Sequence, residues 1–151
     1  MKHMVRSFVC LAFAAGMSFA ASAETTIYVD HNSMNPVSPY GDLTTAAKTI
    51  AAAMVVAADA QDAVVIIVQP GPYAETGFTL DKAITVRGAT GDPADVTITD
   101  SVSGKRAFTI THPDARIEAL TITGAGMRST SSQHGGHLSL SGGAVSNCMI
   151  E

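Results

Sequence analysis

Three aspartates flank one turn in the middle of the chain, and an arginine follows them. Asp92, Asp95 and Asp100 carry the carboxylate oxygens that calcium prefers as ligands. Arg106 is a residue type that could then act as the base in an elimination reaction beside a uronate carboxylate. Solvated turn carboxylates are the simpler interpretation, and we favour it over a metal site. We therefore expect no cofactor, with calcium as the one metal that this group would suggest.

Two histidines form the other group with metal-ligand spacing. His134 and His137 lie at positions i and i+3 in a loop rich in serine and glycine. This spacing can bring two imidazoles onto one metal ion, but a zinc site uses at least three protein ligands. The neighbouring sequence offers no third histidine, cysteine or carboxylate. We interpret the segment as a long polar loop between strands.

Single side chains elsewhere are weaker candidates for binding or catalysis. Tyr73 could offer a stacking face to a sugar ring, and Arg106 could bind an acidic group of a substrate, but one aromatic ring is no binding site. Cys148 falls on an inward position of a predicted strand, and no histidine or aspartate is placed to activate it. We expect a buried thiol there, not a nucleophile.

Composition excludes two broad classes of protein. The chain has 151 residues, of which 46% are hydrophobic, 5% aromatic and 15% charged, with a net charge of −4. A disordered chain would be more charged and less rich in β-branched residues, and a nucleic-acid-binding protein would be basic. The sequence also contains no phosphate-binding glycine loop and no G-x-S-x-G nucleophile motif. We expect neither nucleic acid nor a nucleotide as a partner.

The N-terminal segment, 1–23, has the three parts of a secretory signal peptide. Lys2 and Arg6 precede an apolar run at 8–20, which ends in Ala21-Ser22-Ala23 before a cleavage site at Glu24. The apolar run is shorter than the roughly 20 residues that a membrane-spanning helix needs. We therefore predict export to the cell exterior or outer surface and no transmembrane segment in the mature chain.

Residues 24–60 are predicted to form a strand, a loop and one capping helix. Residues 25–30 alternate as in a strand, and residues 31–40 contain two prolines. From there the apolar spacing becomes helical, with Gly41 and Asp42 before the helix as breaker and cap. The helix face is expected at Leu43, Ala47, Ile50, Met54 and Ala58.

Residues 61–151 read as short strands separated by turns. The predicted strands are 63–69, 78–80, 83–87, 96–99, 107–111, 117–123, 138–140 and 145–150. Two fixed offsets in sequence number run through them. The triplets at 78–80, 108–110 and 138–140 share one pattern at a constant offset of 30, and residues 115–122 align with 143–150 at an offset of 28.

A fixed period favours a stacked repeat over a sandwich, because each coil must bury the same inward positions as its predecessor. The predicted fold is therefore all-β, a right-handed parallel β-helix whose N-terminal amphipathic helix covers the open edge of the first coil. Strand 145–150 lies in mid-coil and no polar cap follows it. We expect residues 61–151 to be the first coils of a longer stack, truncated at the C-terminus.

Several segments together resemble a known superfamily. IYVD, PYGDLTTAAKTIAAAM, AVVIIVQPGPYAETG, KAITVRGATGDPADVTITD, ARIEALTITGAG and GGAVSNCMIE follow one another as in the N-terminal part of secreted bacterial β-helix repeat proteins of the pectin-lyase-like superfamily. The resemblance covers essentially all of residues 24–151. It implies the fold and export, but leaves the chemistry open, because lyases, hydrolases, esterases and adhesins share this scaffold.

Two functions follow from this resemblance. The first is a non-catalytic cell-surface or extracellular scaffold for binding or adhesion, with polysaccharide or other surface components as partners. The second is the N-terminal portion of a polysaccharide lyase, hydrolase or pectinesterase-like enzyme whose catalytic residues lie beyond residue 151. We favour the first, because the chain matches no catalytic motif of these enzymes and has no adjacent aspartate pair.

Overall fold

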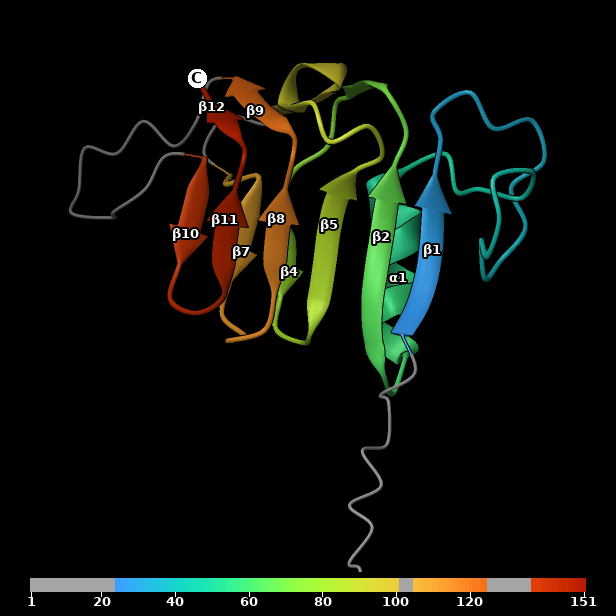
Figure 1. Cartoon of the computed structure of the whole chain (residues 1–151), viewed down its shortest axis with the longest axis horizontal. Coiled ribbons are helices and arrows are strands. Elements are labelled where there is room, and N and C mark those ends of the chain that lie inside the picture. The colour runs from blue at the N-terminus through green and yellow to red at the C-terminus, as the bar shows by residue number, and fades with distance from the viewer. Residues whose placement is uncertain (1–23, 101–104, 125–136) are drawn as a thin grey trace, which may run out of the picture.

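The computed structural model describes residues 24–100, 105–124 and 137–151, which are mostly β-strand (Figure 1). This part of the chain contains one α-helix, α1 (Ile50–Asp59), and a single turn of 3-10 helix at Pro93–Asp95. The strands are β1 (Glu24–Val29), β2 (Ala63–Val68), β3 (Gly71–Tyr73), β4 (Phe78–Leu80), β5 (Ile84–Gly88), β6 (Val96–Asp100), β7 (Phe108–Ile110), β8 (Arg116–Glu118), β9 (Thr121–Gly124), β10 (Leu138–Leu140), β11 (Ala144–Ser146) and β12 (Met149–Ile150). The prediction of a mostly β fold with one helix is confirmed for these residues.

The strands form three parallel sheets. Sheet A has the order β1-β2-β5-β8-β11, sheet B the order β3-β6-β9-β12 and sheet C the order β4-β7-β10. Along the chain, β2, β3 and β4 enter sheets A, B and C in turn, and the next two sets of three strands repeat that order. We call each such set a pass of the chain. Every pass adds one strand beside its counterpart from the pass before.

The two sequence offsets are the registers of sheet C and of the last strand pairs in sheets A and B. In sheet C, Phe108 pairs with Phe78 on one side and with Leu138 on the other, which is the offset of 30. In sheets A and B, Val145 pairs with Ile117 and Ile150 with Ile122, which is the offset of 28. The registers predicted from the repeated patterns are therefore confirmed.

Alternate side chains of the strands build one apolar core. In β2 the even-numbered residues are buried and the odd-numbered ones are partly exposed, as period-2 alternation requires. Two aromatic rings meet in this core, Phe78 of β4 and Phe108 of β7, with centroids 5.1 Å apart. Because the strands pair in register, equivalent inward residues lie one above another between the sheets.

Two of the predicted strands are each divided by a sharp corner. The predicted strand 117–123 is β8 and β9, and the predicted strand 145–150 is β11 and β12. Ala119 and Asn147 occupy the corners with φ of 53° and 48°, a left-handed conformation that ends the extended run. The corner directs the chain from sheet A into sheet B, which alternation of apolar residues alone does not reveal.

Helix α1 begins later than the apolar spacing predicts. Thr49 is its N-cap, and its buried face is Ile50, Ala53 and Ala57. Leu43 is 51% exposed and lies outside the helix, so the predicted helix start was wrong. The physical reason is a local turn, in which the Asp42 carboxylate accepts hydrogen bonds from the backbone N–H groups of the two threonines that follow Leu43.

The segment before α1, not the helix, covers the outer edge of β1. The Tyr28 N–H donates to the Tyr40 carbonyl (2.9 Å), and the Ala47 N–H donates to the Tyr28 carbonyl (2.9 Å). The Asp30 N–H in turn donates to the Ala47 carbonyl (2.8 Å). Helix α1 packs instead on the inward side of β1 and β2, where Figure 1 shows it behind these two strands. The helix also lies beside β4, the first strand of sheet C, where Met54 and Val55 adjoin Phe78 and Thr79, so its placement agrees with the expectation that it covers the open edge of the first coil.

A carboxylate from the first pass holds the start of α1. The backbone N–H groups of Ile50 and Ala51 donate to the two carboxylate oxygens of Glu75, at 2.9 and 2.8 Å. The first N–H groups of a helix lack partners within the helix, and its N-terminus favours negative charge. Glu75 therefore ties the helix to the segment between β3 and β4.

We expect Glu75→Gln to destabilise the fold by about 1–2 kcal/mol, because the amide loses the charge and one of the two acceptor oxygens at the helix N-terminus. Chemical denaturation followed by circular dichroism measures the change. Glu118→Gln, the same substitution on β8 away from the helix, is the control. Equal stability of the two variants would contradict this role for Glu75.

We expect Phe108→Ala to destabilise the fold by about 3–5 kcal/mol, because it empties a fully buried position between two paired strands. Thr79→Ala, at an exposed position of β4, should change the free energy of unfolding far less. Denaturant unfolding of both variants tests this. A similar loss in both would mean that the Phe108 ring is not central to the core.

Candidate functional site

The backbones of the three aspartates in the predicted calcium group lie at the two ends of one strand, β6 (Val96–Asp100). Asp92 and Asp95 are exposed at the start of β6, whereas Asp100 is its last residue. A strand of this length spans about 13 Å, so Asp100 lies far from the other two. The Asp92 carboxylate instead accepts a hydrogen bond from the Ala94 N–H at 2.9 Å and caps the short helical turn. Asp92 and Asp95 therefore form part of a turn, as the simpler interpretation holds.

The two substrate-binding candidates lie on different elements. Tyr73 is only 3% exposed, so it offers no stacking face to a sugar. Its hydroxyl donates to the Gln69 carbonyl at 2.9 Å. Arg106 is half-buried just before β7, where its carbonyl accepts from the Gly77 N–H (2.9 Å). The structure thus gives Tyr73 a place in the core.

The histidine pair and the cysteine lie near the last strands. His134 falls outside the described residues. His137 is half-buried before β10, and its carbonyl accepts a hydrogen bond from the Ala107 N–H at 2.8 Å. Cys148 is half-buried, and burial raises the pKa of its thiol, which favours the protonated form.

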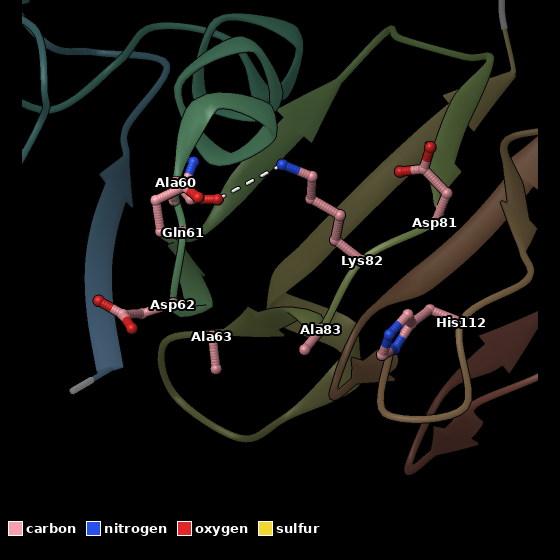
Figure 2. A pocket seen from close by; sticks show the side chains of 8 residues that line it. All are labelled: Ala60, Gln61, Asp62, Ala63, Asp81, Lys82, Ala83 and His112. Carbon is pink, nitrogen blue, oxygen red and sulfur yellow. Dashed lines mark hydrogen bonds between the residues drawn. The ribbon is translucent and has the colours of Figure 1, made fainter. Parts of the chain in front are cut away.

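Sequence reasoning missed a polar pocket of about 370 Å³ where the chain turns from sheet C into sheet A (Figure 2). Asp62 precedes β2, Asp81 and Lys82 connect β4 to β5, and His112 lies between β7 and β8. Three successive passes therefore each contribute polar residues. The pocket is lined by Ala60, Gln61, Asp62, Ala63, Asp81, Lys82, Ala83 and His112.

Hydrogen bonds to the end of α1 hold the Lys82 side chain of this pocket in place. Its Nζ donates to the carbonyls of Ala58 and Ala60 at the end of α1. Figure 2 shows the lysine reaching across to the helix. A cation at a helix C-terminus is favourable, because the last carbonyls lack partners within the helix. The pocket thus holds the carboxylates of Asp62 and Asp81 against the single ammonium of Lys82, which gives its lining a net negative charge.

His112 presents a hydrogen-bond donor. The Asp114 N–H donates to His112 Nδ1 at 3.1 Å, so this nitrogen carries no proton in that contact. The neutral ring then holds its proton on Nε2. The pocket accordingly combines a donor with the acceptor oxygens of Asp62 and Asp81. This mixture suits a ligand whose groups both donate and accept hydrogen bonds.

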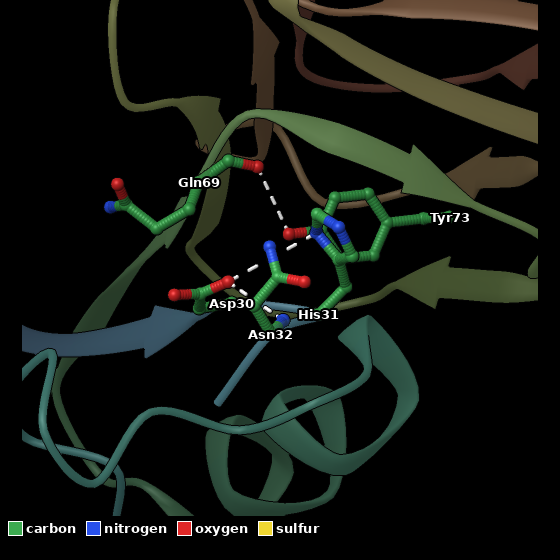
Figure 3. Close-up of polar contacts among 5 residues, drawn as sticks. All are labelled: Asp30, His31, Asn32, Gln69 and Tyr73. Atoms are coloured by element: carbon green, nitrogen blue, oxygen red, sulfur yellow. Dashed lines mark hydrogen bonds and ion pairs between the residues drawn. The ribbon is translucent and has the colours of Figure 1, made fainter. Parts of the chain in front are cut away.

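A second polar cluster supports the fold where β1 and β2 end (Figure 3). The His31 ring stands edge-on to Tyr73, with centroids 5.6 Å apart, and its Nδ1 lies 4.0 Å from Asp30 Oδ1. A side chain at Gly71 would clash with the His31 ring, because an added Cβ would lie 2.1 Å from its Cε1 atom. His31 and Tyr73 therefore join the loop after β1 to the segment after β2. The sequence of the loop at 31–40 does not predict this contact between His31 and Tyr73.

The residues that the structure describes contain neither a group of metal ligands nor a membrane-spanning helix. No three histidine, cysteine, aspartate or glutamate side chains among them are grouped as metal ligands would be. None of the helices in those residues has the length and apolar character needed to cross a membrane.

Comparisons with known proteins give no relative. No protein-family model matches the chain, and neither a curated protein nor a solved structure is significantly similar to it.

Burial gives Tyr73 a pH dependence that can be measured. Loss of solvent raises the pKa of its hydroxyl from 10.0 to about 12. The folded state thus holds this proton more tightly than the unfolded chain. Its contribution to stability is complete below pH 10 and is lost as the pH rises to about 12.

We expect the free energy of unfolding to fall over this pH range more steeply in the parent chain than in Tyr73→Phe, which has no proton to lose. Urea unfolding at several alkaline pH values measures both slopes. Phenolate absorbance of the folded protein provides the second readout. Identical slopes would show that Tyr73 is not held in a buried, neutral state.

Proposed function

We propose that the chain is an exported, non-catalytic binding scaffold that opens a right-handed parallel β-helix of the pectin-lyase-like kind. The observation that carries this proposal is the in-register addition of one strand to each of three parallel sheets on every pass. A β-helix requires this arrangement, since equivalent residues of successive coils must stack.

Export rests on the segment 1–23, which lies outside the described part of the chain. Its charged start, apolar middle and small residues before Glu24 are those of a secretory signal. The small, cysteine-poor remainder cannot form an internal disulfide, so its stability has to come from the stacked core. We place the protein outside the cell or on its outer surface.

The pocket between sheets C and A is the proposed binding site, and a neutral saccharide is the proposed ligand. Sugar hydroxyls both donate and accept hydrogen bonds, which matches the carboxylates of Asp62 and Asp81 beside the Nε2–H of His112. The volume of about 370 Å³ is sufficient for a small ligand. Because the two carboxylates outnumber the one ammonium of Lys82, the lining is acidic and disfavours uronates.

Calorimetric titration with cello-, xylo- and galacto-oligosaccharides tests this function. We expect binding of at least one neutral saccharide and none of oligogalacturonate. Asp81→Ala should weaken that binding about five- to tenfold, the equivalent of about one hydrogen bond. Asp95→Ala removes an exposed carboxylate outside the pocket and should leave the affinity unchanged.

Three outcomes would overturn the proposal. The first is no binding of any saccharide in the panel, and the second is an equal effect of Asp81→Ala and Asp95→Ala. The third is an unsaturated, ultraviolet-absorbing product from polygalacturonate with calcium. That product would identify a lyase and favour the enzymatic alternative.

A further inference from the structure

His112 is the only histidine among the residues that line the pocket between sheets C and A. Histidine is the side-chain type that changes its charge between about pH 5 and 8. The lining of the pocket therefore contains a group that can respond to pH in this range. The protonation state of the ring also decides which donors and acceptors the pocket offers to a ligand.

A hydrogen bond from its own loop holds the His112 ring in the neutral state. The Asp114 N–H donates to Nδ1 at 3.1 Å, and only a nitrogen without a proton can accept this bond. The Ala115 N–H donates to the His112 carbonyl at 3.2 Å, so the same turn also holds the backbone of this residue. In Figure 2 the ring extends from its loop toward Ala83, on the opposite side of the pocket opening. The turn thus directs Nε2–H toward the pocket.

Protonation of the ring removes this support. A proton on Nδ1 sets one N–H group against the Asp114 N–H, and two donors cannot form a hydrogen bond. The charged groups that face the ring from the other two connections are Asp62, Asp81 and Lys82, and Asp114 belongs to its own loop. A positively charged ring is attracted to the carboxylates of Asp62 and Asp81, which are the acceptors of the pocket.

We infer that the pocket binds its saccharide with His112 neutral and loses affinity in acid, so that pH regulates the proposed binding function on which this inference rests. In acid the ring leaves the position from which Nε2–H reaches the ligand, and the carboxylates pair with the ring in place of the sugar hydroxyls. Lys82 does not replace the lost donor, because its Nζ is bonded to the end of α1.

Calorimetric titration at two pH values tests this regulation. We expect a saccharide that binds at about pH 7.5 to bind at least about fivefold more weakly at about pH 5. His112→Gln keeps an N–H group but cannot be protonated, so its affinities at the two pH values should be equal. His137→Gln is the same substitution on a histidine outside the pocket and should retain the ratio of the parent chain. Circular dichroism at both pH values checks that the variants fold.

Proton release provides a test that needs no variant. If the complex requires a neutral ring, binding in mild acid has to expel the proton that the free protein carries. Titration at about pH 6 in two buffers of different ionisation enthalpy measures the number of protons released. We expect a fraction of one proton at this pH and none at about pH 8.

The hydrogen bond within the loop can be tested without any ligand. In nuclear magnetic resonance spectra recorded across this pH range, the amide signal of Asp114 should shift together with the ring signals of His112. This coupling follows from the loss of the bond between the Asp114 N–H and Nδ1 on protonation.

The outcomes separate the regulation from the function. No saccharide binding at either pH would overturn the proposed function together with its regulation. Equal affinity at the two pH values, or binding near pH 6 without proton release, would overturn the regulation alone. An equal loss of affinity in His112→Gln, or an Asp114 amide that does not follow the ring, would overturn it as well.

Discussion

The structure depends on in-register pairing of parallel strands from successive passes. Neighbouring strands lie about 4.8 Å apart, so a side chain on one pass rests directly on its counterpart in the next. Phe108 lies between Phe78 and Leu138 for this reason. Only residues that tolerate such stacking can occupy inward positions. The low aromatic and charged content of the chain, 5% and 15%, follows from that requirement.

The same constraint acts at the corner between sheets A and B. Gly88 follows Arg87, which pairs with Glu118, so Gly88 lies beside the corner residue Ala119. A Cβ at Gly88 would lie 2.1 Å from the Ala119 carbonyl oxygen, which leaves no room for a side chain. The loop after Gly88 then crosses the corner, where the Asn147 side-chain amide donates to the Gly91 carbonyl at 2.7 Å. Gly88 thus lets the chain pass close to the corner at Ala119, and the loop that follows Gly88 is hydrogen-bonded to the corner at Asn147.

The sequence predicts those features that repeat, and it misses those that arise once. The two offsets predict the registers of sheet C and of the last strand pairs in sheets A and B, because stacking forces equivalent residues into equivalent places. The earlier pairs in sheets A and B have other offsets, because their connections differ in length. The start of α1 depends on the Asp42 turn and on Glu75, which lies in the first pass, after the helix. Tyr73 of that pass contacts His31, which lies in the loop after β1, before the first pass. No periodic pattern carries such single contacts, and the polar pocket was missed for the same reason.

Stacking also determines where chemistry can reside. Inward positions of the strands are filled by the core, and the backbone of each inner strand is used by pairing on both sides. Functional side chains therefore have to lie at the outward positions of the strands or on the connections between sheets, and only the connections differ in length. Asp81 and His112 lie on two such connections, one above the other, because their strands stack. Under the proposed function, such a scaffold holds binding residues from separate connections at the spacing of its strands, and a change of ligand requires no change in its core.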